Sequence, residues 1–215
     1  ARYRGTRIIQ GIGDLQQIAT SKNIRMALLK SPTYIVQAFN GYERREVHDI
    51  DMLAFGTDMP VITQGLLELG YETEQRTRQH KGGECLFFKK DLLIEVHKVA
   101  SNRRRFQRLL STEDLLQRAI ITEHYSPLLK LSDSDEALIM VLHAYHHGWR
   151  EALWIRDLAA WWRIRNPNPN EVLETFKAVD LLRTGWMAWI GMSIIGWSLP
   201  EAWTLQNWCA HPAFD

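Results

Sequence analysis

Residues 48–55 read HDIDMLAF and place two carboxylates, Asp49 and Asp51, inside an apolar run. A carboxylate in a strand that enters a hydrophobic core is costly unless its charge is compensated. Strand side chains alternate between faces, so Asp49 and Asp51 point one way while Ile50 and Met52 point the other. Two carboxylates this close repel each other, which raises a pKa unless a cation lies between them. Because hard divalent ions prefer oxygen ligands, the pair predicts a site for Mg²⁺ or Mn²⁺.

A third carboxylate, Glu95, lies in the later apolar run LLIEVHKV (92–99), where alternation puts it on the same face as His97. If this strand neighbours the strand of Asp49 and Asp51, the three carboxylates form one acidic patch. Such a patch predicts a two-metal site, in which one ion activates an attacking oxygen and the other holds phosphates and the leaving group. Asp49, Asp51 and Glu95 are therefore the candidate catalytic and metal-binding residues.

The segment LLKSPTY (28–34) predicts a phosphate-binding element. Ser31 stands where a helix N-cap belongs and Pro32 stands at the first helical position, a pattern typical of a helix start. The free N–H groups of a helix N-terminus bind anions, and Lys30 adds a positive charge beside them. Arg45, a few residues before the aspartate pair, supplies a guanidinium fork that suits phosphate.

The elements that must position these residues precede about residue 100, where short apolar runs alternate with helical patterns. The expected strands cover residues 25–30, 47–55, 84–90 and 92–99. The expected helices cover residues 32–39 and 60–70, the second ending at Gly70. The last two strands flank Asp91 and predict a hairpin. Together these elements predict an α/β domain over residues 1 to about 110, with a small mixed sheet flanked by helices.

The sequence after residue 110 is helical in pattern. The expected helices cover residues 111–120, 132–149 and 150–164, and the run NPNPN (166–170) breaks the pattern before the next helix. All nine tryptophans lie after residue 148, which predicts a bulky aromatic core for this part. We therefore expect a helical domain over residues 111–215 that forms the other wall of a cleft.

Composition limits the classes of function. The chain has 215 residues, of which 46% are hydrophobic and 24% charged, with a net charge of +1, a profile typical of globular proteins. This balance gives no support for a protein that relies on bulk positive charge, and it argues against a long nucleic acid as partner. The two cysteines, Cys85 and Cys209, are far apart and lack a partner motif, so we expect a reducing, cytoplasmic location. The uncharged stretch 185–200 is short and interrupted by glycine, so we expect a buried helix and no membrane span.

The helix around HAYHHGW carries a third group of polar residues. His143, His147 and Arg150 share one face by their i, i+4, i+7 spacing. A histidine pair at i, i+4 is compatible with zinc, but no third ligand follows and the Glu of a His-Glu-x-x-His motif is absent. We interpret these residues as lining the cleft together with His97, or, for one of the histidines, as hydrogen-bonded within the core.

The order of these motifs resembles the polymerase-beta-like nucleotidyltransferase superfamily, and more narrowly a bacterial branch of uncharacterised nucleotidyltransferases. The motifs that carry the resemblance are LLKS (28–31), Arg45 before DIDML (49–53), GY (70–71), IEVHK (94–98), LHAYHHGW (142–149) and WIRD (154–157). They extend from about residue 24 to about residue 160 in the expected order.

The resemblance implies a metal-dependent enzyme that moves a nucleoside monophosphate from a nucleoside triphosphate (NTP) to an acceptor hydroxyl or phosphate and releases pyrophosphate. Asp49 and Asp51 would bind both metal ions. Glu95 would bind the ion that activates the acceptor and could serve as its base. Ser31 and the backbone after it would hold the β- and γ-phosphates beside Lys30. Acceptors conceivable for the branch include antibiotic-like small molecules, peptide natural products, proteins and RNA ends.

Two departures from the family pattern leave alternatives open. Ser31, which Pro32 follows, stands where a glycine is expected after the lysine. His48 stands where a small residue is expected before the aspartate pair. Glycine would allow closer approach of the backbone to a triphosphate. The alternatives are transfer of another phosphate-linked group, such as a sugar from a nucleotide sugar, a catalytically impaired nucleotide-binding protein, or an antitoxin-like partner of another protein.

Overall fold

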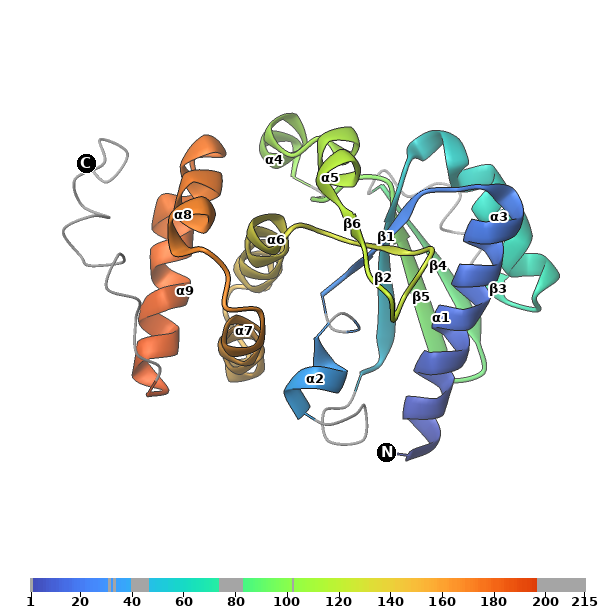
Figure 1. Ribbon diagram of the computed structural model, residues 1–215, viewed down its shortest axis with the longest axis horizontal. Coiled ribbons are helices and arrows are strands. Elements are labelled where there is room, and N and C mark those ends of the chain that lie inside the picture. The colour runs from blue at the N-terminus through green and yellow to red at the C-terminus, as the bar shows by residue number, and fades with distance from the viewer. Residues whose placement is uncertain are drawn as a thin grey trace. The chain divides into compact units, whose positions relative to one another are not determined.

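The computed structural model describes residues 2–30, 32, 34–39, 47–73, 83–101 and 103–196, with side chains from residue 5 onward. The chain divides into two compact units, Ala1–Ser132 and Asp133–Asp215. The first unit is a mixed α/β structure and the second is helical (Figure 1). The functional boundary near residue 110 stays a prediction.

A seven-stranded mixed sheet forms the centre of the first unit, with the strand order β3-β4-β5-β2-β1-β7-β6 in the described part of the chain. The strands are β1 (Met26–Leu29), β2 (Asp49–Ala54), β3 (Glu72–Thr73), β4 (Glu84–Lys89), β5 (Leu92–His97), β6 (Ile120–Ile121) and β7 (Leu129–Lys130). β2 pairs in parallel with β5 and β1 with β7, while the other neighbours are antiparallel. The predicted fold class, an α/β domain with a mixed sheet followed by helices, is confirmed.

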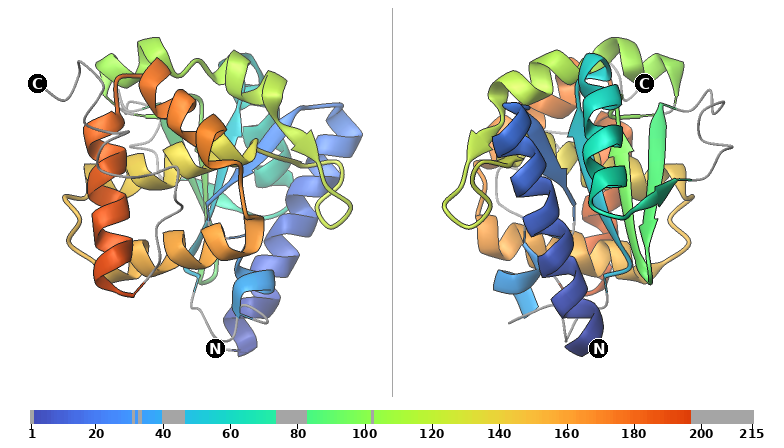
Figure 2. Two further views of the ribbon diagram at one scale, coloured as in Figure 1. Left: turned by 60° about the vertical axis from the view of Figure 1, so that its left-hand side comes forward. Right: turned by 90° about the vertical axis from the view of Figure 1, so that its right-hand side faces the viewer.

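The first unit also contains five α-helices in its described part. They are α1 (Arg2–Lys22), α2 (Ile35–Phe39), α3 (Met59–Glu68), α4 (Arg104–Leu109) and α5 (Thr112–Arg118), and a short 3₁₀ turn η2 (Gly56–Asp58) precedes α3. α1 and α3 lie side by side on one side of the sheet (Figures 1 and 2). The sequence analysis did not predict α1, although its buried Ile8, Ile12 and Leu15 recur at helical spacing.

The two faces of β2 and β5 differ as the alternation predicted. Ile50, Met52 and Ile94 are fully buried on one face. Gly11 of α1 packs against that face so closely that a Cβ atom there would lie 2.7 Å from Ile50 Cδ1 and 2.7 Å from Leu92 Cδ2. The helix-covered face of the sheet is therefore the apolar one, and the acidic side chains of β2 and β5 point to the opposite face.

Two turns position Tyr71 and the residues between β4 and β5. α3 ends in a Schellman motif, in which Gly70 adopts a φ of +81° and the N–H of Tyr71 donates to the Leu66 carbonyl. The motif turns the chain directly into the buried Tyr71. The predicted hairpin around Asp91 is confirmed, because Lys89 pairs with Leu92 and leaves a two-residue turn of Lys90 and Asp91.

The α-helix expected from residue 32 begins later. Pro32 lies in a 3₁₀ turn, and α2 begins at Ile35. Lys30 has a φ of +56°, so the chain bends directly after β1. The carbonyl of Pro32 accepts a hydrogen bond of 2.6 Å from the Tyr125 hydroxyl, which ties this turn to the segment before β7.

The second unit contains α6 (Asp133–His146), α7 (Ala152–Arg165), α8 (Pro169–Ala178) and α9 (Leu182–Ile194). Its core includes Trp161, Trp162 and Trp189, with the last two rings 4.5 Å apart, which accords with the predicted aromatic core. Asn168 caps α8 by accepting from the Asn170 N–H, so the NPNPN breaker doubles as a helix start. None of the described helices is long and apolar enough to cross a membrane.

The close contact of α1 with the sheet yields a stability prediction. Gly11→Ala is expected to be less stable than Gly13→Ala by about 1–3 kcal/mol, because its new methyl group overpacks Ile50 and Leu92. Gly13 is the matched control, since a methyl group added there would meet no atom within 4 Å and both variants gain the same helix propensity. Urea unfolding of the two variants measures the difference, and equal midpoints would contradict this packing.

Candidate active site

The strand register brings Asp51 and Glu95 together. β2 and β5 are parallel neighbours, and Asp51 lies opposite Glu95 while Leu53 lies opposite His97. Side chains of paired residues in neighbouring strands project from the same face of the sheet. Asp51, Glu95 and His97 therefore project side by side, as the sequence predicted on the condition that the two strands are neighbours.

Asp51 is the central residue of the group. Its Oδ1 atom accepts a hydrogen bond of 3.0 Å from Lys30 Nζ and lies 2.9 Å from His97 Nε2. The residue is only 3% exposed. Burial by itself raises the pKa of Asp51, but the Lys30 charge and the His97 contact outweigh it and hold this pKa well below its usual range. Asp51 is therefore ionised and already faces two cationic or hydrogen-bonding groups.

The pKa values of the other two carboxyls, Asp49 and Glu95, are raised instead of lowered. Burial and the charge of Asp51 raise the pKa of Asp49, and burial and the same charge raise the pKa of Glu95. Lys30 lowers both but does not compensate them. Among the described residues, the Lys30 charge does not offset burial and the neighbouring Asp51 charge at these two carboxyls, and a bound cation would favour their ionised forms.

His97 joins the carboxylates as a further candidate ligand. Asp51, Glu95 and His97 each offer one ligand atom, and these atoms lie within 4.8 Å of one another. On its other side, His97 Nδ1 lies 3.6 Å from the Glu84 carboxylate. Two carboxylates and an imidazole suit a divalent cation such as Mn²⁺ or Mg²⁺, so the residues present fit a metal site. Asp49 is on the same face but outside this group, and its role as a ligand stays a prediction.

The predicted phosphate-binding residues are only partly described by the structure. Lys30 lies at the end of β1, and its ammonium group contacts Asp51. Ser31 and Arg45 lie outside the described residues. His48 is exposed immediately before β2, so it does not join the apolar core, and its charge lowers the pKa of Asp49.

Two of the three polar residues predicted in the helical unit, His143 and His147, contact each other and an aromatic ring of α7. The rings of His143 and His147 lie 4.6 Å apart, and both contact the Trp154 ring of α7, at 5.4 and 5.1 Å between centroids. Arg150 is exposed. The histidine pair thus belongs to an aromatic cluster, and its predicted place in a cleft stays a prediction.

Sequence reasoning missed Glu84. The signal was present, because a two-residue turn at Lys90 and Asp91 fixes the hairpin register and sets Glu84 opposite His97. Counting outward from that turn would have identified Glu84 as the neighbour of the histidine.

Comparisons with a protein family and with a solved structure agree with this site geometry. The sequence matches the model of the family described as uncharacterised nucleotidyltransferase over residues 1–190. The fold is similar to the solution structure of the antibiotic-resistance factor ANT(2″)-Ia, with a TM-score of 0.50 and 11% sequence identity over 89% of this chain and 92% of that one. No curated protein matches the sequence.

Because the family model covers most of the chain, the protein belongs to this nucleotidyltransferase family. It is an enzyme of the nucleotidyltransferase class, as the order of its motifs had implied. At 11% identity the similarity to the resistance factor concerns the fold alone.

The raised pKa of Glu95 predicts how the metal-free protein responds to substitution. Glu95→Gln should stabilise the protein near neutral pH, because a carboxyl whose pKa rises on folding destabilises the folded state while it is ionised. The gain should vanish as the pH falls below the usual value of 4.5, where this carboxyl is protonated in both states.

Denaturant midpoints across this pH range, measured with a chelator present, test the prediction. Glu72→Gln is the matched control, since Glu72 is an exposed carboxylate of the same sheet. If Glu95→Gln instead lowers the stability near neutral pH, the Glu95 carboxylate forms a net stabilising pair with His97.

Proposed function

We propose that this enzyme transfers a nucleoside monophosphate from an NTP to a hydroxyl or phosphate of an acceptor and releases pyrophosphate, with Mg²⁺ or Mn²⁺ as cofactor. The observation that supports this proposal best is the pairing of Asp51 with Glu95 on adjacent parallel strands. A pair of carboxylates with an uncompensated charge suits a reaction in which metal ions and substrate phosphates meet.

In the proposed reaction the acceptor oxygen forms a bond to the α-phosphorus while the bond from this phosphorus to the pyrophosphate oxygen breaks. Asp49 and Asp51 hold the metal ions, which supply charge neutralisation and activation of the attacking oxygen when bound. Glu95 would hold the ion that activates the acceptor and accept the acceptor proton.

Lys30 has two roles in the proposed reaction. Without substrate its ammonium group neutralises Asp51 at 3.0 Å. With substrate it binds the phosphates, together with Ser31 and Arg45. A lysine is suited to such a change of partner because its charge is carried on a long, flexible side chain.

The acceptor is proposed as a small molecule, a peptide natural product or a protein. The near-neutral net charge of +1 disfavours a long nucleic acid. Small antibiotics belong in the first acceptor panel, because the solved structure of similar fold is an antibiotic-resistance factor.

Pyrophosphate release is the direct test of the proposed reaction. With an NTP, Mg²⁺ or Mn²⁺ and an acceptor panel, the wild type should release pyrophosphate and a chelator should stop it. Glu95→Gln should slow turnover by about 100-fold or more, the usual contribution of a general base. Glu72→Gln is the control and should keep full activity.

Product analysis by mass spectrometry separates the alternatives. Acceptors that gain a nucleoside monophosphate support the proposal, whereas acceptors that gain a sugar from a nucleotide sugar contradict it. Binding of NTP without release of pyrophosphate for any acceptor class would indicate a nucleotide-binding protein. Asp51→Asn is a less clear probe, because removing one partner of a buried charged group costs about 3–5 kcal/mol of stability.

A Lys30→Met variant tests the proposed change of partner. It should bind a non-hydrolysable NTP about tenfold more weakly, since one hydrogen bond between charged groups is lost. It should bind Mn²⁺ alone more tightly than the wild type, because the competing cation on Asp51 is gone. Calorimetry measures both affinities, with Lys22→Met of α1 as the control. If both affinities fall together, Lys30 only supports the structure of the site.

A further inference from the structure

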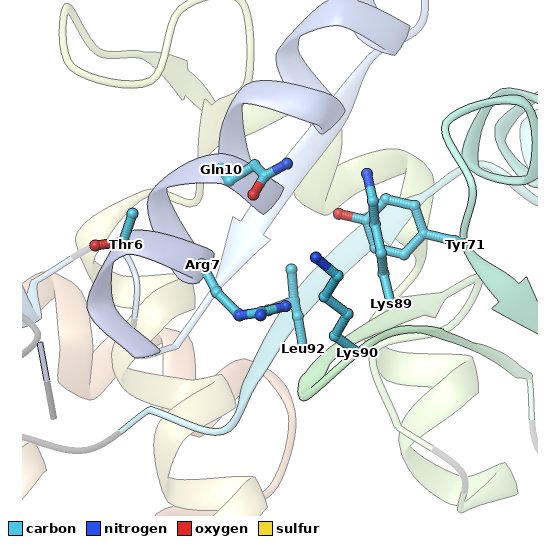
Figure 3. Close-up of a pocket in the computed structure, with 7 residues that line it drawn as sticks. All are labelled: Thr6, Arg7, Gln10, Tyr71, Lys89, Lys90 and Leu92. Atoms are coloured by element: carbon cyan, nitrogen blue, oxygen red, sulfur yellow. The ribbon is translucent and has the colours of Figure 1, made fainter. Parts of the chain in front are cut away.

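The first unit contains a pocket on the α1 side of the sheet. It has a volume of about 290 Å³ and is lined by α1, by Tyr71 and by the turn between β4 and β5 (Figure 3). The lining residues are Thr6, Arg7, Gln10, Tyr71, Lys89, Lys90 and Leu92. They include three cationic side chains and no acidic one. The volume is near the lower end of the range of about 300–1,000 Å³ for small-molecule sites, so it suits a small ligand.

Two of the three cations of this pocket form ion pairs with aspartates. Arg7 Nε lies 2.7 Å from Asp91 Oδ1, and Lys89 Nζ lies 3.4 Å from Asp14 Oδ2. Neither aspartate lines the pocket. These ion pairs fix the direction of two long side chains, which reduces the conformational entropy that a ligand would otherwise have to remove.

Lys90 is the cation that has no such partner in the described part of the chain. It occupies a turn position with a φ of +60°, a backbone conformation that favours glycine. Figure 3 shows its side chain and that of Arg7 extending toward the same space from different elements. Asp91 and Asp14 balance the charges of Arg7 and Lys89, so the charge of Lys90 remains in excess among these groups and an anion in the pocket would offset it.

The lining chemistry narrows the kind of anion. Lys89 Nζ lies 4.8 Å from the centre of the Tyr71 ring and covers it, and Tyr71 itself is 2% exposed. The Tyr71 hydroxyl donates to Asp14 at 2.8 Å. Leu92 is the only other apolar side chain of the lining. The pocket therefore offers hydrogen-bond donors and positive charge but no aromatic face for a nucleobase.

The position of the pocket separates it from the candidate active site. Leu92 contacts the α1 side of the sheet, as its closeness to Gly11 shows. Glu95 is three residues further along β5, an odd number, and so points to the opposite face. A molecule in this pocket is therefore a separate ligand on the other side of the strand that carries Glu95.

We infer that this pocket binds a small phosphate-type oxyanion, either inorganic or carried on a small organic molecule, between Lys90 and Arg7. Guanidinium and ammonium groups together provide a fork and a point charge, the combination that commonly binds phosphate. This inference does not rest on the proposed function, because it concerns different residues and requires no metal.

Titration with inorganic pyrophosphate, inorganic phosphate and glucose 6-phosphate tests the inference. The measurements use calorimetry and amide chemical shifts in the presence of EDTA, at constant ionic strength set with NaCl. Lys90→Gly is the main variant, since it removes the charge and relieves the backbone conformation at once. It should bind the tightest of these probes about tenfold more weakly than the wild type, while amides of Gln10 and Lys90 shift in the wild type only.

Two further variants make the outcome specific. Lys22→Ala removes one charge from the far end of α1 and should bind as the wild type does. Lys30→Met removes the lysine beside Asp51 and should leave the ligand-induced shifts of the Gln10 and Lys90 amides as they are in the wild type. Tighter binding of glucose 6-phosphate than of phosphate would indicate an organic carrier, and the reverse would indicate a free oxyanion. Binding that is lost in Lys30→Met but kept in Lys90→Gly, or no binding of any probe, would overturn the inference.

Discussion

The parallel pairing of β2 with β5 is the constraint on which the site depends. It sets Asp51 opposite Glu95 in adjacent strands and leaves both carboxylates on a face that already holds Asp49. The charge that gathers there needs compensation, since burial makes isolated ionised groups costly. Lys30 and His97 supply part of it at Asp51, whereas the pKa values of Asp49 and Glu95 remain raised. An incomplete balance of this kind keeps the group structured and still receptive to divalent cations.

The same sheet separates two kinds of chemistry by its two faces. One face collects the carboxylates, and the other packs against α1 through a contact so close that residue 11 has no room for a side chain. That contact brings the first turns of α1 to the β4–β5 turn, where the basic pocket forms. Strand alternation thus keeps a negatively charged site and a positively charged one apart, although both use residues of β5.

The helical unit shows a different use of buried charge. Glu136 is 1% exposed, accepts a hydrogen bond of 2.9 Å from Trp161 Nε1 and lies 3.8 Å from Arg165 Nε. A buried carboxylate with such partners is satisfied within the core. Trp161 therefore serves as a packing and hydrogen-bonding group of the unit, and Trp162 and Trp189 pack against each other beside it.

The sequence by itself determined the local features of this protein. Period-2 alternation predicted that Asp49 and Asp51 share a face, and the two apolar runs that flank Asp91 predicted the hairpin there. It also determined the family, because the order of LLKS, DIDML and IEVHK can be recognised in the sequence without knowing which residues are in contact. These features depend on neighbours in the chain, which is why they can be read from spacing.

Tertiary structure alone decided which distant residues meet. No pattern states that β2 pairs with β5, that Lys30 turns back onto Asp51, or that α1 covers the apolar face. The turn before α2 is tied down by the hydrogen bond from Tyr125 to the Pro32 carbonyl, a contact between residues 93 positions apart. Such contacts depend on the free energy of the whole packed unit, so local propensity could not foresee them.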